Sequence, residues 1–223
     1  VSVLEQLAEQ RPYIPFSEET INFLDALYQA LRKENQSVQA ADLAAFSFWC
    51  RKGNLSHIRE QYVCQWKGKN VLGRGVAFHI VPSNIPVLFA FSMVASLLAG
   101  DPVVLRLPQN ETMQEQMILS ALRHVMEVQP EWKKRIVILR YGHRKEVTDA
   151  LSRLCQVRVI WGGDHSIQEI QKSALEPGKT ELAFADRRSA AVLRADAILE
   201  KEDLTDIVCG FYNDTYLNDQ NAC

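Results

Sequence analysis

Three short segments of the chain carry residues that could hold a ligand. They are Pro82–Pro86, Arg106–Gln109 and Trp161–Asp164, and each follows an apolar run that is typical of a short buried strand. The glycine pair Gly162 and Gly163 allows a ligand to approach the backbone closely, and a helix starting behind it would offer unpaired N–H groups to a phosphate. The sequence has no GxGxxG fingerprint, and a Gly-Gly-Asp turn with an Asp cap is also an ordinary strand-to-helix connection. The segments therefore indicate a binding edge without defining its ligand.

The elements that must position these segments alternate regularly from residue 75 onward. We predict strands at 75–81, 102–106, 135–140 and 157–161 and helices at 86–99, 111–128, 145–154 and 166–173. Strands that alternate with helices form right-handed βαβ units, so we predict an α/β fold with a doubly wound parallel sheet. Ligands of such sheets bind beyond the carboxyl ends of the strands, where all three segments would meet.

The first part of the chain is expected to be helical. Residues 1–58 should form an N-terminal helical segment that packs on an α/β domain of residues 59–223. A helix beginning after Ser17 would bury the evenly spaced residues Ile21, Leu24, Leu27, Tyr28 and Leu31. A second helix, Ser37–Lys52, would end at Gly53. Its expected buried residues are Val38, Ala41, Ala45, Phe48 and Trp49.

Shorter stretches complete the expected fold. Tyr62–Trp66 should be a short strand, and the last part of the chain should hold an extended piece at 190–193 and a helix at 200–213. Cys209 on that helix is expected to be a small core residue. His79 alternates within a strand, so we expect it to pack in the core and not to act as a catalyst.

Composition and charge exclude several classes of protein. The 223 residues include 25 Lys+Arg and 27 Asp+Glu, and the net charge of −2 excludes the strongly basic surface of a general nucleic-acid binder. The longest apolar run, 86–99, is shorter than the roughly 20 residues that a membrane span needs. The five cysteines and five histidines show no metal-ligand spacing, so we expect no metal site and a reducing, cytoplasmic location.

In combination, the segments resemble those of the aldehyde dehydrogenase superfamily. More specifically, the chain looks like the N-terminal half of a LuxC-type acyl-CoA reductase. The resemblance extends over residues 73–223 and rests on Pro82–Pro86, Ala99–Arg106, Val159–Asp164, Phe184–Ser189 and Asp219–Cys223. It implies an oxidoreductase that reduces a fatty acyl-CoA thioester to the aldehyde with NADPH, or alternatively with NADH, through a cysteine thioacyl intermediate.

The resemblance also implies roles for individual residues. Cys223 corresponds to the nucleophile, and Asn84 with the backbone N–H of Cys223 corresponds to the oxyanion hole. Gln109 replaces the Glu of many NAD-preferring relatives, whose carboxylate would repel a 2′-phosphate. Arg106 corresponds to the residue that contacts the adenosine ribose. The implied cofactor-binding residues are Pro82, Ser83, Arg106, Gln109, Gly162 and Gly163.

Two departures from aldehyde dehydrogenases bear on the reaction. Residues 184–189, Phe-Ala-Asp-Arg-Arg-Ser, stand where hydrolytic members carry a general-base Glu, so hydrolysis of a thioester is disfavoured and a thiol fits as the second acyl partner. Arg187 and Arg188 would either hold a phosphate or pair at the surface with Asp186. Asp164 replaces a small hydroxyl residue, and we assign it to the cap of the helix behind it.

Further expectations concern the whole protein. We expect a C-terminal catalytic domain after residue 223 that supplies the other half of the cleft, so that this chain alone would be inactive. The acyl group would arrive as an acyl-CoA or acyl-protein thioester, and the sequence is compatible with a homo-oligomer or with an acyl-transfer partner protein. The alternatives are a phosphate-activated acyl reductase or ordinary aldehyde dehydrogenase, and a catalytically silent module that binds nucleotide or delivers acyl groups.

Overall fold

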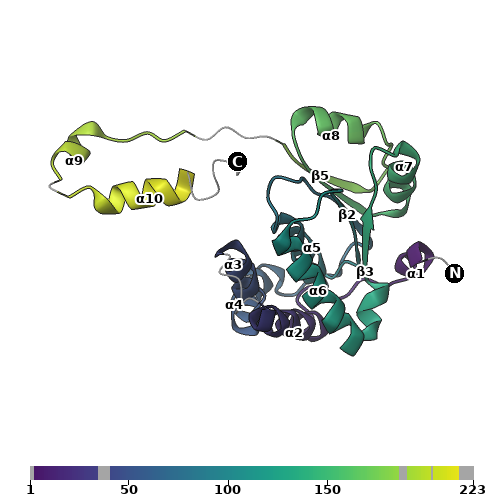
Figure 1. Ribbon diagram of the computed structural model, residues 1–223. Coiled ribbons are helices and arrows are strands. Elements are labelled where there is room, and N and C mark those ends of the chain that lie inside the picture. The colour runs from purple at the N-terminus through teal and green to yellow at the C-terminus, as the bar shows by residue number, and fades with distance from the viewer. Residues whose placement is uncertain (1–2, 35–40, 186–189, 202, 216–223) are drawn as a thin grey trace.

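The protein is built around a parallel sheet (Figure 1), and the five strands of this sheet lie in the order β3-β2-β1-β4-β5. The computed structural model describes residues 3–34, 41–185, 190–201 and 203–215. The strands are β1 (Ala77–Ile80), β2 (Val103–Leu107), β3 (Ile136–Arg140), β4 (Val157–Trp161) and β5 (Thr180–Phe184). The order reverses between β1 and β4, so the sheet is doubly wound and the predicted α/β class is confirmed.

The register of the sheet brings the three predicted segments to one edge. Ile80 pairs with Arg106 on one side and with Ile160 on the other, so β1, β2 and β4 end at the same level. The segments that begin at Pro82, Arg106 and Trp161 therefore leave the sheet at its carboxyl edge, next to the reversal in strand order. This placement is the one that the sequence predicts.

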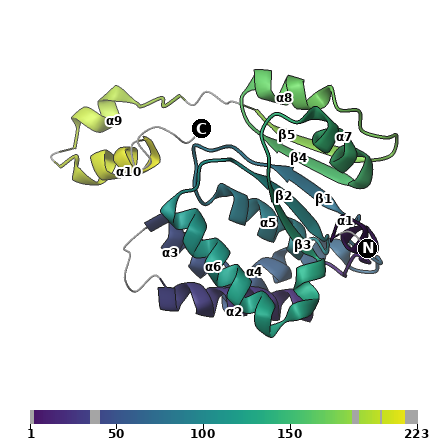
Figure 2. The same cartoon turned by 45° about the vertical axis from the view of Figure 1, so that its right-hand side comes forward.

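Helices cover both faces of the sheet (Figure 2). One face carries α5 (Leu88–Leu98) and α6 (Met113–Val128), with α2 (Glu18–Glu34), α3 (Ala41–Trp49), α4 (Lys52–Val63) and the 3-10 helix η3 (Pro130–Lys134) on the same side. The other face carries α1 (Val3–Ala8), α7 (Lys145–Leu154) and α8 (Asp164–Gln171). The loops that follow the strands lie at the carboxyl edge of the sheet, between these two helical layers.

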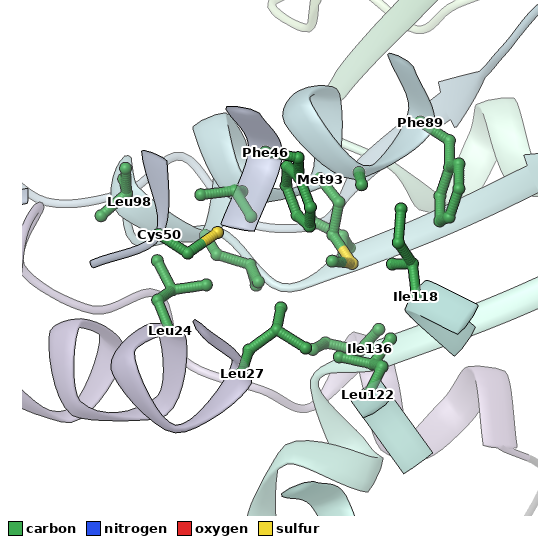
Figure 3. Close-up of a cluster of buried hydrophobic side chains, with 14 of the residues drawn as sticks. Leu24, Leu27, Phe46, Cys50, Phe89, Met93, Leu98, Ile118, Leu122 and Ile136 are labelled. Carbon is green, nitrogen blue, oxygen red and sulfur yellow. The ribbon is translucent and has the colours of Figure 1, made fainter. Parts of the chain in front are cut away.

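The larger apolar core lies between the sheet and the N-terminal helices (Figure 3). The predicted face of α2 is confirmed: its buried residues include Ile21, Leu24, Leu27 and Leu31, and Tyr28 is half-buried. Phe23 of α2 stacks on Trp132 of η3 with 4.1 Å between ring centroids. These contacts join the N-terminal helices to the layer that covers β2 and β3.

The buried face of α3 differs from the predicted one. The side chains that pack inward are Leu43, Phe46 and Cys50. The expected Ala41, Ala45 and Phe48 are exposed, Trp49 is half-buried and Val38 lies outside the described residues. Both sets satisfy the helical period, but burying Leu43 and Phe46 removes more apolar area from water than burying two alanines would.

The helix α3 also ends earlier than predicted, and another helix follows it. Asn54 Nδ2 donates to the carbonyl oxygen of Trp49 at 2.8 Å, and Asp25 Oδ1 accepts from the N–H of Lys52 at 2.8 Å. These bonds separate α3 from α4. Gly53 therefore lies inside α4 and does not end a helix.

The predicted strand Tyr62–Trp66 is helical. It forms the end of α4 and the 3-10 helix η2 (Cys64–Trp66). The ring centroids of Tyr62 and Trp66 lie 5.9 and 6.3 Å from that of Phe16. Aromatic residues four positions apart share one face of a helix, and here they imitate the alternation of a strand.

The part of the chain after residue 180 differs most from expectation. Thr180–Phe184 forms the edge strand β5, which the sequence pattern does not predict, whereas the extended piece at 190–193 belongs to no strand. The helices that follow are α9 (Ala195–Leu199) and α10 (Thr205–Thr215), and they lie apart from the sheet (Figure 1). Cys209 is exposed on α10, so the expectation of a core residue is wrong.

Candidate functional site

The carboxyl end of β1 continues into the loop Pro82–Pro86. Pro82 and Ser83 line a small pocket together with Pro108, Asn110, Thr112 and Glu115 from the chain after β2. Asn84 is exposed on the same loop. The helix α5 begins at Leu88, two residues after the predicted start at Pro86, because Pro86 still belongs to a turn. The structure thus brings the predicted loop of β1 against the predicted loop of β2.

Arg106 is held in place by the residue that follows β3. Its Nε donates to the carbonyl oxygen of Tyr141 at 3.3 Å, and its Cζ lies 5.6 Å from the centroid of the Tyr141 ring. Burial raises the pKa of the Tyr141 phenol, so this ring stays neutral. Among the described residues, no carboxylate forms an ion pair with Arg106. Its half-buried guanidinium therefore keeps its charge available at the end of β2.

Gln109 is exposed and lies against Gly142, which sequence reasoning missed. A Cβ at Gly142 would lie 3.3 Å from Gln109 Nε2, so the glycine lets the two loops approach each other. Tyr141 and Gly142 directly follow β3, as the three predicted segments follow their strands. The rule that ligands bind beyond strand ends could have identified them.

The glycine pair after β4 leads into α8. The N–H of Gly162 donates to the carbonyl oxygen of Phe184 in β5 at 3.2 Å. Gly163 is the N-cap of α8, and within the described chain no side chain caps this helix. The assignment of Asp164 to the cap is therefore wrong, because Asp164 is exposed in the first turn of the helix. A residue without a side chain therefore occupies the cap position, and the acidic Asp164 follows it.

A buried polar group fixes Trp161 at the end of β4. Ser92 Oγ on α5 accepts from Trp161 Nε1 at 3.0 Å and lies 2.8 Å from Nδ1 of His79. The Trp161 ring stacks on Phe184 with 3.9 Å between centroids. Burial lowers the pKa of His79 to about 3, so this residue is neutral at physiological pH. His79 is buried, as predicted, and it joins β1 to α5.

Of the predicted catalytic pair, only Asn84 lies among the described residues. Cys223 lies outside them with the rest of Asp219–Cys223, as do Asp186, Arg187 and Arg188. Both catalytic roles therefore stay predictions.

The other cysteines differ in exposure and ionisation. Burial raises the pKa of the Cys50 thiol far above its ordinary value and that of Cys155 to about 11, so both are protonated and unreactive at neutral pH. Cys64 and Cys209 are exposed, and none of these four described cysteines forms a disulfide. The described residues contain no group of three or more His, Cys, Asp or Glu side chains arranged to hold a metal ion. None of the described helices is long and apolar enough to cross a membrane.

Several solved structures have the same fold as this chain. PnpE from Pseudomonas sp. WBC-3 matches with a TM-score of 0.72 at 15% identity, and the matched region covers 99% of this chain and 49% of the PnpE chain. An aldehyde dehydrogenase from Bacillus cereus in an NAD+ complex has a TM-score of 0.65 at 16% identity, with coverages of 99% and 49%. A putative aldehyde dehydrogenase from Burkholderia cenocepacia has a TM-score of 0.67 at 17% identity, with coverages of 92% and 45%. The fold is that of the aldehyde dehydrogenases, and the chain spans about half the length of these structures.

The family follows from the sequence itself. Residues 13–223 match the acyl-CoA reductase (LuxC) family, and the chain belongs to that family, as the resemblance predicts. A search of curated proteins finds no match.

Proposed function

We propose that the protein reduces a fatty acyl-CoA thioester to the aldehyde with NADPH. The reaction consumes acyl-CoA, NADPH and a proton and yields the aldehyde, free CoA and NADP+. One observation carries the proposal: Pro82–Asn84, Arg106–Gln109 and Gly162–Gly163 meet at one sheet edge in a chain of the acyl-CoA reductase family. Because the chain spans about half the length of the similar structures, the activity of the whole protein is part of the proposal.

The strand ends fit the shape and charge of a dinucleotide. Arg106 presents a cation that Tyr141 has already oriented, which suits contact with the adenosine ribose and its 2′-phosphate. Gly162 and Gly163 would let a pyrophosphate approach the backbone at the start of α8, where the positive end of the helix dipole favours an anion. The exposed Asp164 carboxylate in the first turn would have to point away from that phosphate. A bound nicotinamide would supply the hydride.

Charge at the same edge favours NADPH over NADH. The amide of Gln109 is neutral, so it does not repel a 2′-phosphate as a carboxylate would. Arg106 adds a positive charge at the end of β2, and the exposed Arg144 adds another in the loop after β3. These two cations would attract an additional phosphate on the ribose.

The acyl chemistry is assigned to Cys223 and Asn84. The thiolate of Cys223 would attack the thioester carbonyl, and the CoA thiolate would leave, which gives a thioacyl-enzyme. The Asn84 amide would donate to the oxyanion that forms during the attack, and a donor of this kind contributes about 2.7–4 kcal/mol to lowering the barrier. We place the reaction in the cytoplasm, where thiols stay reduced. An acyl-protein thioester would react in the same way.

The test compares two variants of the full-length protein, in each of which one cysteine is replaced by serine. After incubation with a long-chain acyl-CoA, intact-protein mass spectrometry measures the thioacyl adduct, and gas chromatography measures the aldehyde formed with NADPH. Cys223→Ser should lose both signals, whereas Cys209→Ser, at an exposed cysteine outside the predicted site, should keep both. Aldehyde formation by Cys223→Ser would refute the nucleophile. Free acid as the product would indicate a hydrolytic aldehyde dehydrogenase, and calorimetric binding of NADPH without turnover would indicate a silent module.

A further inference from the structure

A cation at the end of β3 joins the binding edge to the start of α6. Arg140 is the last residue of β3, and its Nη1 donates to the carbonyl oxygen of Pro108 in the loop after β2. Its Nη2 forms ion pairs with the carboxylates of Glu115 and Glu111, the latter at 3.0 Å. Pro108 directly precedes Gln109, and Glu115 lies in the first turn of α6. The guanidinium therefore connects both ends of the loop after β2 to β3.

The burial of this group argues against a purely stabilising role. The side chain of Glu115 is 5% exposed and that of Arg140 is 25% exposed. Taking two charges out of water costs about as much as their attraction returns, so a buried ion pair is an inefficient way to stabilise a fold. The first turn of α6 is also capped independently, because Thr112 Oγ1 accepts from the N–H of Glu115 at 3.2 Å. What a forked guanidinium adds is a fixed direction between its partners.

The loop that is held in this way carries Gln109. After Arg140 the chain continues into Tyr141 and Gly142. Tyr141 accepts the hydrogen bond from Arg106, and Gly142 lies against the Gln109 amide. Arg140 thus begins the loop after β3 and also holds the loop after β2 through Pro108. A change in its contacts would therefore move the Gln109 amide relative to Arg106. Arg140 is paired with two carboxylates, and the three groups together carry a net charge of −1, so Arg106 is the cation that a phosphate would meet.

We propose that Arg140 and Glu115 are positioning residues that hold Gln109 in the place where it discriminates a dinucleotide with a 2′-phosphate from one without. This inference rests on the proposed dinucleotide site. Without the pair, the loop would relax and the geometry around the 2′ position would be lost. The affinity for NADPH should then fall more than the affinity for NADH, because NADH has no group at that position.

The test replaces the ion pair with an apolar pair in the full-length protein. In Arg140→Met/Glu115→Met, side chains of similar length fill the same space without buried charge, so the melting temperature should stay close to that of the wild type. Calorimetric titration should show NADPH binding weakened about tenfold and NADH binding changed less than about threefold. The matched control is Lys172→Met/Glu169→Met, which removes an exposed ion pair on the far side of the sheet and should leave the ratio of the two dissociation constants unchanged.

The titration separates a failure of the inference from a failure of the proposed function. An unchanged NADPH-to-NADH ratio, or an equal loss of affinity for both, would show a merely structural role and overturn the inference while the proposed function stands. A wild type that binds neither dinucleotide would overturn the proposed function and the inference with it. If circular dichroism shows that the double variant does not fold, Arg140→Lys carries the test. Lysine keeps the charge but not the fork, so an unchanged ratio in that variant would equally overturn the inference.

Discussion

Acid should destabilise the protein through one buried histidine. His79 on β1 is 1% exposed, and burial lowers its pKa from the ordinary 6.5 to about 3. In the unfolded chain the same imidazole is in water and takes up a proton near its ordinary pKa. Unfolding therefore binds a proton at any pH between these two values, and the free energy of unfolding falls as the pH falls through that window.

The size of the effect follows from the two pKa values. Between about pH 7 and pH 5 the loss amounts to about 2 kcal/mol, which corresponds to about 4–8 °C in melting temperature for a chain of this size. The described contacts of His79 contain no charge that would favour its protonated form. His79 contacts the neutral hydroxyl of Ser92, and the other partner of that hydroxyl is the neutral indole of Trp161. The difference between the wild type and a variant without this imidazole therefore measures the contribution of His79.

The assay is urea unfolding followed by circular dichroism at a series of pH values. The variant His79→Leu should lose about 2 kcal/mol less than the wild type between about pH 7 and pH 5, because all other titrating groups are shared. The matched control His124→Gln, at an exposed histidine on α6, should follow the wild type. Parallel pH curves for the wild type and His79→Leu would refute the assignment of the acid sensitivity to His79.

Two further substitutions test the backbone and the polar core. Gly100→Ala should destabilise the protein by about 3 kcal/mol or more in urea unfolding, because Gly100 has a φ of +94° and a Cβ there would lie 2.1 Å from a backbone oxygen. Gly178→Ala, with a φ of +86° but open space, should cost about 1 kcal/mol, and equal costs would contradict the steric argument. Ser92→Ala should cost about 1–3 kcal/mol and shift the tryptophan emission, since it leaves the Trp161 N–H without its acceptor. A similar cost for the control Ser96→Ala on the same helix would show that the hydroxyl of Ser92 has no special role.

The central elements could be predicted because their signals are local. The helix at 145–154 and the strand at 157–161 have the bounds that their periodicity predicts. The strand β5 could not be predicted in this way, since it lies at the sheet edge with exposed Leu182 and Phe184. It is a strand because Val157 to Trp161 pair with Thr180 to Phe184, and that pairing is visible only once the chain is folded.

The position of the candidate site could also be predicted, but its internal contacts could not. Strand ends predict that Arg106 and the glycines after β4 share one edge. The partner of Arg106 is Tyr141, and their contact exists because β3 lies directly beside β2. The ion pair of Arg140 with Glu115 joins residues that are 25 positions apart in the chain and have no common motif. Contacts of this kind depend on strand order, which local patterns do not contain.

The two arginines at the ends of neighbouring strands show how partners decide the task of a residue. Arg140 is paired with two carboxylates, which more than offset its charge, so its contribution to the site is the forked geometry of its contacts. Arg106 meets a carbonyl oxygen and an aromatic ring, which orient the guanidinium without cancelling its charge. An anion that approaches this edge is therefore attracted by Arg106, while Arg140 determines where the neighbouring Gln109 lies. In the proposed site, selectivity for a 2′-phosphate depends on two groups. Arg106 on β2 attracts the phosphate, and Arg140 on the adjacent strand β3 holds the neutral Gln109 beside it.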